Sequence, residues 1–522
     1  MRKISYALLL VFAFCLAAAT SVPAGDLERA TAVLDSLEHK LSWLEMRLGQ
    51  ERWLRLTGQG GDSLRYFRNL VQYTFGEEDI FKLLHGVQSD IAAGSDARRF
   101  AVLYPQVLKN YVDNQSRVQR VYSSLVDLHD GRKVPLEGFH TEESIVREIA
   151  TLDRSRDRRE SAYRALNSPD ESVKDAVALL FRSRNQVARK LGYNDYFSLC
   201  ASADSENGED YRRLIDRLDS ITAEPFRQVT GRLQTETSAP LEPWDWHSSV
   251  LSLAPEVDSY FPVDSQLQFV RQTMLGMGFN LDKLPIYFHL LEDTTGAGLA
   301  VTVYIDIPND CRIVANLRSG FVGMSELLGA VGVAVHAAYI SEREPVFARM
   351  SDSGWAATTR LVFERICYRP DWLTTVAHVP SGQTARVGEM LKAYDLYCTR
   401  LLLANMAFEY DAYHNPNRDL SETYWEAMEN YTGLPRHVEL APWASDSRFI
   451  TSPFLSRELV QARLAAAQIL GYLNDEYGTV IDNTTIRSFL VQNLFRFGLR
   501  YDWRELLERG TGSPLTAAYM IR

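Results

Sequence analysis

The chain has little cysteine: five residues in 522, none of them in a Cys-x-x-Cys pair. A zinc site built on cysteine therefore has no support. Cys15 lies in the N-terminal segment described below. The remaining four are an even number, which permits two disulfides in an exported protein, but they could equally be small buried apolar residues. They are Cys200, Cys311, Cys367 and Cys398.

Runs of lysine and arginine are also missing, and the formal net charge is -11. Non-specific binding to nucleic acid needs basic patches, so no nucleic-acid partner is expected. The sequence has no P-loop, no dinucleotide-binding fingerprint in the right context and no Gly-x-Ser-x-Gly elbow. With 24% charged and 46% hydrophobic residues, the composition is that of an ordinary globular protein.

After the N-terminus, no apolar stretch reaches membrane-span length without charges, so no stable membrane span is expected. The N-terminus itself combines Arg2 and Lys3 with an apolar run over residues 6–19 and small residues that end at Ala24. This order is typical of a signal peptide. We expect residues 1–24 to be removed and the mature protein to be periplasmic or extracellular. A retained N-terminal anchor is the alternative.

Most of the mature chain has apolar residues at three- and four-residue spacing, which is the pattern of amphipathic helices. Residues 284–316 differ, because they are β-branched and aromatic and are broken up by Gly, Pro and Asp. They predict a small cluster of strands. No clean linker is visible; residues 235–249 come nearest to one. We therefore expect residues 25–522 to form a single, mainly α-helical domain.

Directly after the predicted strands comes an apolar helix, "ELLGAVGVAVHAAYIS" over residues 326–341, with one histidine, His336. Zinc peptidases with an HExxH helix place two histidines four residues apart on one face, so that both can bind one metal ion. The glutamate after the first histidine polarises the metal-bound water, and a third ligand, often glutamate, follows on the next helix. The helix at His336 has the outline of that motif without most of its chemistry.

If His336 is the second histidine, Gly332 stands at the first ligand position and Val333 at the position of the base. Neither side chain can bind zinc or transfer a proton. The next predicted helix, residues 353–366, has no acid near its start, and Glu364 lies about two turns further on. From these residues alone, His336 is expected to be a packed core histidine rather than a ligand.

Five longer segments together resemble the gluzincin peptidases of the angiotensin-converting-enzyme and thimet-oligopeptidase type. They include a strand that leads into the helix of His336, the helix that follows it, and a late segment where this family has a substrate-binding histidine and tyrosines. Their order and spacing extend the resemblance to roughly the whole mature chain. The segments are residues 182–199, 242–249, 311–339, 354–366 and 447–470.

The resemblance implies a large two-lobed helical fold with a central cleft and a small β-sheet beside the degenerate zinc helix. The departures from the family lie where its chemistry lies. By position, the vestigial metal ligands are Gly332, His336 and Ala357, and the vestigial base is Val333. The late segment has Ile450 to Ser452 where a histidine is expected, and Leu455 and Glu458 where tyrosines are expected. Isoleucine and leucine cannot stabilise a developing negative charge as tyrosine and histidine do.

These departures predict an exported metallopeptidase-like protein that has lost zinc binding and hydrolysis and binds peptides or a protein partner, with no cofactor. Two alternatives stay open: an active zinc peptidase with substitute ligands, and a non-catalytic subunit paired with an active paralogue. The candidate cleft-lining residues, which could also be buried core residues, are Trp244, Asp245, Trp246, Ile450 and Leu455.

Overall fold

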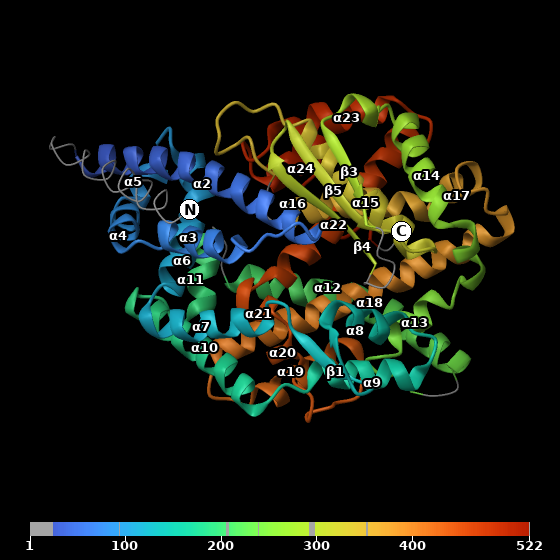
Figure 1. Cartoon of the computed structure of the whole chain (residues 1–522), viewed down its shortest axis with the longest axis horizontal. Coiled ribbons are helices and arrows are strands. Elements are labelled where there is room, and N and C mark those ends of the chain that lie inside the picture. The colour runs from blue at the N-terminus through green and yellow to red at the C-terminus, as the bar shows by residue number, and fades with distance from the viewer. Residues whose placement is uncertain are drawn as a thin grey trace.

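The computed structural model describes residues 25–520, except 93, 205–207, 238–239, 292–297 and 351–352. The predicted signal peptide, residues 1–24, lies outside this part. The labels below are those of Figure 1. The first half of the chain contributes the helices α2 Asp26–Leu56, α3 Leu64–Phe75, α4 Glu78–Gly86, α5 Gln88–Ala92, α6 Ala97–Asp113, α7 Ser116–His129, α8 Glu143–Leu152, α9 Arg156–Asn167, α10 Glu171–Lys190, α11 Tyr196–Ala203, α12 Gly208–Thr237, α13 Trp246–Leu251, η1 Pro255–Tyr260, α14 Val263–Gly276 and η2 Leu281–Lys283.

Helices also dominate the second half, as the apolar spacing predicted. They are α15 Phe321–Ala338, α16 Ser353–Glu364, η3 Arg365–Tyr368, α17 Pro370–Thr375, α18 Ser381–His414, α19 Leu420–Thr432, α20 Pro442–Ser445, α21 Arg448–Thr451, α22 Leu455–Tyr477, α23 Thr485–Asn493, η4 Phe495–Phe497 and α24 Trp503–Thr511.

The strand cluster predicted over residues 284–316 is confirmed as a three-stranded sheet of β3 Ile286–Leu290, β4 Leu299–Asp306 and β5 Asp310–Asn316. The order is β3-β5-β4, with β3 parallel and β4 antiparallel to the central strand. A separate hairpin pairs β1 Lys133–Leu136 with β2 Phe139–Glu142. The chain is thus mainly α-helical, with a small sheet immediately before α15.

The two faces of the three-stranded sheet are covered by different helices. On one face, Val303, Ile305 and Val314 form a small cluster with side chains from α2. Alternate residues, such as Ala300 and Ile313, belong instead to the main core, as the two-residue period of a strand requires. At Gly49 of α2, an added Cβ would lie 1.9 Å from the carbonyl oxygen of Tyr304, so only glycine allows this close approach of helix and strand.

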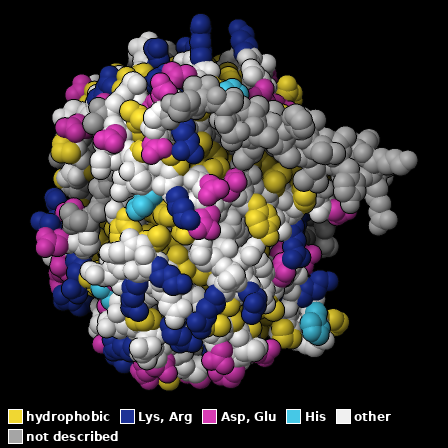
Figure 2. All heavy atoms as spheres, turned by 90° about the vertical axis from the view of Figure 1, so that its left-hand side faces the viewer, with side chains coloured by type: hydrophobic (Ala, Val, Ile, Leu, Met, Phe, Trp, Pro, Cys, Tyr) yellow, Lys and Arg dark blue, Asp and Glu magenta, His cyan; other side chains and the backbone are white. Residues whose placement is uncertain are grey.

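Figure 1 shows the sheet, α15 and α16 in one half of the molecule, and α7, α10, α12 and α19 in the other. One continuous cluster of buried hydrophobic side chains, from Ala30 to Ala517, runs through both halves. The two lobes therefore share a core. Figure 2 shows that hydrophobic side chains also gather near the middle of one face, with charged side chains around them.

Helix α15 is long and apolar enough to cross a membrane by length and composition, but 78% of it is buried inside the fold. A core helix of a globular protein passes the same test, so this helix is poor support for a membrane span. The four cysteines among the described residues are free, which answers the question that their number left open. Cys200, Cys311 and Cys367 are buried apolar residues of the core.

Candidate functional site

Helix α15 lies between the sheet and α16, and small residues let its neighbours approach closely. The hydroxyl of Thr302 on β4 donates to the carbonyl oxygen of Ala330 at 2.7 Å. On the side of α16, a Cβ added at Gly332 would lie 2.2 Å from Cγ and Cδ2 of Phe363. Phe363 is fully buried. The position predicted for the first ligand is therefore occupied by a phenyl ring from the next helix.

His336 is held as a core histidine. Its side chain is 1% exposed, and its Nδ1 lies 2.8 Å from the Thr359 hydroxyl. The imidazole stacks on the ring of Phe495 at 4.2 Å between centroids. Burial lowers the pKa of His336 to about 3, although a backbone hydrogen bond at Phe495 opposes part of the shift. The ring is thus neutral and already engaged with protein partners.

The other two positions predicted for the site, Val333 and Ala357, carry no polar side chain. Val333 is buried and apolar. On α16, Thr359 rather than Ala357 contacts His336, and Phe363, four residues later, contacts Gly332. Thr359 and Phe363 share a face because residues four apart on a helix lie one above the other. The residue of α16 opposite His336 is therefore two positions away from Ala357.

Glu364, the acidic residue on the helix that follows α15, is paired with an arginine. Glu364 accepts from Arg360 at 2.6 Å, and Arg360 also donates to the carbonyl oxygen of Ala300. Burial raises the pKa of Glu364. Within residues 25–520, leaving aside the short gaps, no three His, Cys, Asp or Glu side chains are grouped so that they could hold a metal ion. The side chains around His336 do not fit a zinc site.

A cavity of about 1210 Å³ opens beside α16, between helices from the two ends of the chain. Its walls come from α2, α5, α6, the start of α16, the junction of α21 and α22, and the segment that leads into α24. Thr358 lines it, next in sequence to the partner of His336. The cavity therefore reaches helix α16 but not the buried imidazole.

Two aromatic rings and two sets of nitrogen donors mark one wall of this cavity. Trp355 and Trp503 both line it and stack at 6.2 Å. The indole nitrogen of Trp355 is buried and has no hydrogen-bond partner among the described residues. Arg349 pairs with Glu45 through Nη2, while its Nε and Nη1 likewise lack a partner within the described chain. Buried donors without a partner cost about 1–3 kcal/mol each, so this wall is suited to a ligand with acceptor oxygens.

Another part of the cavity lining carries charges of both signs. Asp204 pairs with Arg457 at 2.9 Å and lies 3.9 Å from the Lys109 ammonium. Burial lowers the pKa of Lys109, but Asp204, Cys200 and Glu458 together outweigh this effect, so the pKa is raised. The ammonium is therefore charged at the wall of the cavity.

A buried carboxyl group positions the loop at the junction of α21 and α22. Oε1 of Glu409 accepts from the backbone N–H of Phe454 at 2.8 Å. Phe454 has a φ of 66°, in the left-handed region that L-residues seldom adopt. Its neighbours Pro453 and Leu455 line the cavity. The hydrogen bond thus holds a strained backbone at the rim of the site.

Replacing this group, Glu409→Gln, should stabilise the protein in alkaline solution. Burial raises the pKa of Glu409 to about 8, so the folded state binds more protons than the unfolded state from about pH 4.5 upward. The free energy of unfolding should fall as pH rises through this window. Glutamine accepts the same hydrogen bond without ionising. We expect the variant to match the wild type near pH 4.5 and to be more stable than the wild type at pH 8.5 by on the order of 4 kcal/mol in urea titrations.

The exposed substitution Glu508→Gln is the matched control for this prediction, and should leave the pH dependence unchanged. A Glu409→Gln protein whose stability falls between pH 4.5 and 8.5 as steeply as that of the wild type would contradict the assignment.

The structure does not place Trp244, Asp245 and Trp246 in the wall of the cavity. All three are at most 5% exposed. Trp246 stacks between Phe226 and Tyr397, at 4.9 and 4.7 Å. The expectation that they line a cleft is corrected: this segment is held in the core through buried aromatic packing against α12 and α18.

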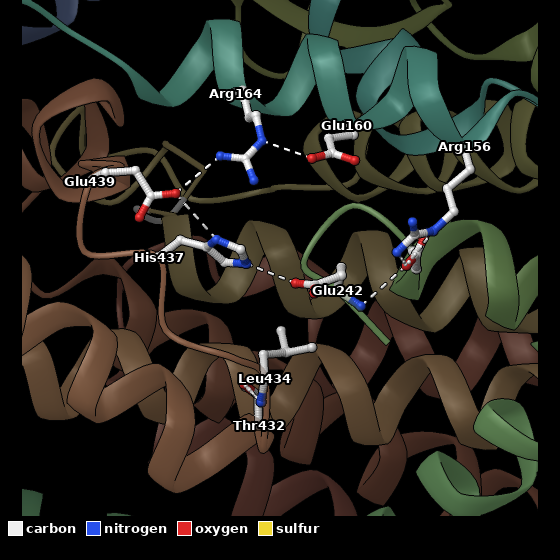
Figure 3. A network of polar contacts seen from close by, with 9 residues as sticks. Arg156, Glu160, Arg164, Glu242, Thr432, Leu434, His437 and Glu439 are labelled. Carbon is white, nitrogen blue, oxygen red and sulfur yellow. Dashed lines mark hydrogen bonds and ion pairs between the residues drawn. The ribbon is translucent and has the colours of Figure 1, made fainter. Parts of the chain in front are cut away.

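Ion pairs around this segment explain its burial. Asp245 accepts from Arg156 and Arg159 of α9, at 2.9 and 3.0 Å. Figure 3 shows the polar network alongside, with His437 between Glu242 and Glu439. Arg164 joins Glu439 to Glu160 in the same view. The charges therefore tie α9 to the loop after α19 and do not face a ligand.

The two late candidates have different surroundings. Leu455 lines the large cavity. Ile450 is fully buried, and its carbonyl oxygen accepts from Arg184 at 2.9 Å, so it lies in the core rather than in the cavity wall. Sequence reasoning missed Arg349, Trp503 and Lys109. Trp355 lies in the segment 354–366 that carries part of the family resemblance, and a tryptophan next to a predicted helix start was the available signal.

Comparison with known proteins places this arrangement among peptidases by fold. No protein-family model matches the chain, and no curated protein matches its sequence significantly. Solved structures do match. An M32 carboxypeptidase from Deinococcus radiodurans R1 is 14% identical, with a TM-score of 0.60, over 95% of this chain and 97% of that one. The chain has a large helical peptidase fold.

Two further peptidase structures agree. PZ peptidase A, solved with an inhibitor, is 13% identical with a TM-score of 0.61. A protein assigned as oligoendopeptidase F is 12% identical with a TM-score of 0.63. Each match covers 88% of this chain and 85% of the chain of the other protein. At these identities the likeness establishes the fold, and the activity has to be argued from the residues of this chain.

Proposed function

We propose that this protein is a peptidase-like scaffold without hydrolytic activity, which binds a peptide or a segment of a protein partner in the cavity beside α16. The observation that carries the proposal is the packing of Phe363 against Gly332. That ring occupies the space that a metal ligand on α15 would need. A hydrolytic site and this core packing cannot coexist.

The chemistry of the donor set supports the same conclusion. Zinc in a hydrolytic site is held by three protein ligands, and a base accepts a proton from the metal-bound water. Here one imidazole is present, and it is bonded to Thr359 and stacked on Phe495. Val333 stands where the base would be. We therefore propose that the protein needs no metal cofactor.

The cavity has the properties of a binding site for an extended polar chain. Its volume of about 1210 Å³ exceeds the 300–1000 Å³ range common for small-molecule pockets. Stacked indoles supply apolar area, and the partnerless donors of Trp355 and Arg349 match the carbonyl and carboxylate oxygens of a peptide. We propose peptides as the ligand class and, because of the N-terminal signal pattern, an exported location for the mature protein.

Metal content and hydrolysis test the loss of catalysis. We expect the mature protein, purified and dialysed, to hold well under 0.1 equivalent of zinc by elemental analysis, since one engaged histidine binds zinc weakly. It should not cleave a library of quenched fluorescent peptides. Near-stoichiometric zinc, together with cleavage that a chelator abolishes, would support the alternative of an active peptidase and refute the proposal.

Peptide binding tests the role of the cavity. A peptide library screened against the mature protein should yield ligands whose affinity falls about tenfold in Trp355→Phe, which removes the indole N–H and keeps an aromatic ring. Trp53→Phe on the outer face of the sheet is the matched control, because Trp53 packs with that separate cluster. If both substitutions leave the affinity unchanged, the ligand does not use this wall. If no peptide binds, the peptide-binding proposal fails.

A further inference from the structure

A second pocket lies apart from the large cavity, between α10 and the segment that follows α18. Its volume is about 690 Å³. Helix α10 contributes side chains at the i, i+3, i+4 and i+7 positions that start at residue 182, so they form one helical face. The other wall is the segment 414–418, and no residue is shared with the large cavity.

The charge of this pocket is of one sign. Three arginines line it, Arg182, Arg189 and Arg418, with His414 beside them and no carboxylate among the lining residues. The chain as a whole carries a net charge of -11, so such a concentration is not a consequence of composition. A concave surface lined by charges of one sign focuses the electrostatic field and raises the local concentration of counter-ions.

The arginines differ in how many of their N–H donors are already bound to other groups of the protein. Arg418 pairs with Glu426, and Nε of Arg189 donates to the carbonyl oxygen of Asn194. His414 lies 3.5 Å from Asp195. The side chain of Arg182 makes no hydrogen bond, ion pair or ring contact with any residue that the structure describes. Its guanidinium group therefore keeps its full set of donors for a ligand.

A buried amide fixes the two walls relative to each other. Asn185 is 1% exposed; its Nδ2 donates to the carbonyl oxygen of Tyr413 at 2.7 Å, and its Oδ1 accepts from the backbone N–H of Tyr196 at 2.8 Å. These bonds join α10 to the end of α18 and to the start of α11. The spacing between the backbone segments that carry the arginines is thus set by the core.

We propose that this pocket binds a ligand that carries phosphate or sulfate groups. Guanidinium groups match oxyanions because their planar array of N–H donors forms paired, charge-assisted hydrogen bonds. Several guanidinium groups in one concavity favour a multiply charged anion over a single carboxylate. The site is independent of peptide binding in the large cavity, so either can be present without the other.

Pyrophosphate is the first probe, titrated into the mature protein by calorimetry at 50 and 150 mM salt. The affinity should fall about tenfold or more in Arg182→Gln and further in Arg182→Gln/Arg189→Gln, while Arg182→Lys keeps the charge and loses the paired geometry. Arg213→Gln/Arg227→Gln removes the same charge from exposed positions on α12 and should change the affinity less than twofold. Circular dichroism confirms that each variant is folded.

Vesicles distinguish the two sources of such a group. If the ligand is a lipid headgroup, the protein should sediment with vesicles that contain phosphatidylglycerol and not with phosphatidylcholine alone, and Arg182→Gln/Arg189→Gln should abolish sedimentation. If it is a soluble anion, only pyrophosphate should bind. The proposal is overturned if neither probe binds, or if the α12 control loses as much affinity as the pocket variants.

Discussion

Replacing Gly332 by alanine should lower the free energy of unfolding by about 2–3 kcal/mol, although alanine is the better helix former. The added methyl group would lie 2.2 Å from two carbon atoms of the Phe363 ring and 2.7 Å from its Cβ. Because that ring is fully buried, it cannot move aside without displacing other core groups. Urea titration of the variant, followed by circular dichroism, measures the effect.

At a glycine with open space around it, the same substitution should raise the free energy of unfolding instead of lowering it. Gly388 lies inside α18, and a Cβ there meets no atom within 4 Å. Gly388→Ala should therefore stabilise the protein by about 0.5–1 kcal/mol, from helix propensity alone. Phe363→Leu should relieve part of the strain, so Gly332→Ala/Phe363→Leu should be more stable than the sum of the single effects. A Gly332→Ala protein as stable as the wild type would show that α15 and α16 are not packed as described.

The helices and the small sheet could be predicted because their signals are local. Apolar spacing along a helix and the β-branched segments over residues 284–316 depend on neighbours within a few positions, and both predictions are confirmed. The position of α15 directly after the strands was predicted from the same local signals. The free state of the four cysteines did not, since pairing depends on distances between remote segments.

The environment of the Trp-Asp-Trp segment could not be predicted, because an aromatic side chain can either line a cavity or fill a core. What decides is tertiary: Trp246 is enclosed by rings of α12 and α18, and Asp245 by two arginines of α9, which lie 86 and 89 residues away. No pattern within residues 242–249 records those partners.

The residue of α16 that contacts His336 shows that a shift of only two positions in the helix changes which side chain faces the histidine. Each residue advances a helix by about 100°, so a shift of two positions, from Ala357 to Thr359, turns the side chain by about 200°. The sequence does not fix such a register where no ligand-type side chain marks the position. The contact between Thr359 and His336 fixes it, and Phe363 then follows as the residue against Gly332.

That register determines how a zinc site could be rebuilt. We expect Gly332→His/Val333→Glu/Thr359→Glu/Phe363→Ala to bind zinc near one equivalent, by elemental analysis after dialysis. The substitution at Phe363 removes the ring that the new imidazole would overlap, and the substitution at Thr359 places a carboxylate beside His336. Truncating a buried phenylalanine costs about 3–5 kcal/mol, which the larger side chain at position 332 should partly offset.

Two matched variants test whether zinc binding depends on the exact positions of the substitutions or only on the number of added ligands. The same set without Phe363→Ala should fold poorly or hold no zinc, because the ring still fills the site. The set with Ala357→Glu in place of Thr359→Glu should bind zinc at least tenfold more weakly, since that carboxylate leaves the helix on another face. If the fourfold variant that includes Phe363→Ala and Thr359→Glu folds but holds no more zinc than the wild type, the α15–α16 pair is not a blocked metal site. If only the fourfold variant with Phe363→Ala and Thr359→Glu gains zinc, core packing at Phe363 together with the absence of ligands keeps the wild-type protein from binding zinc.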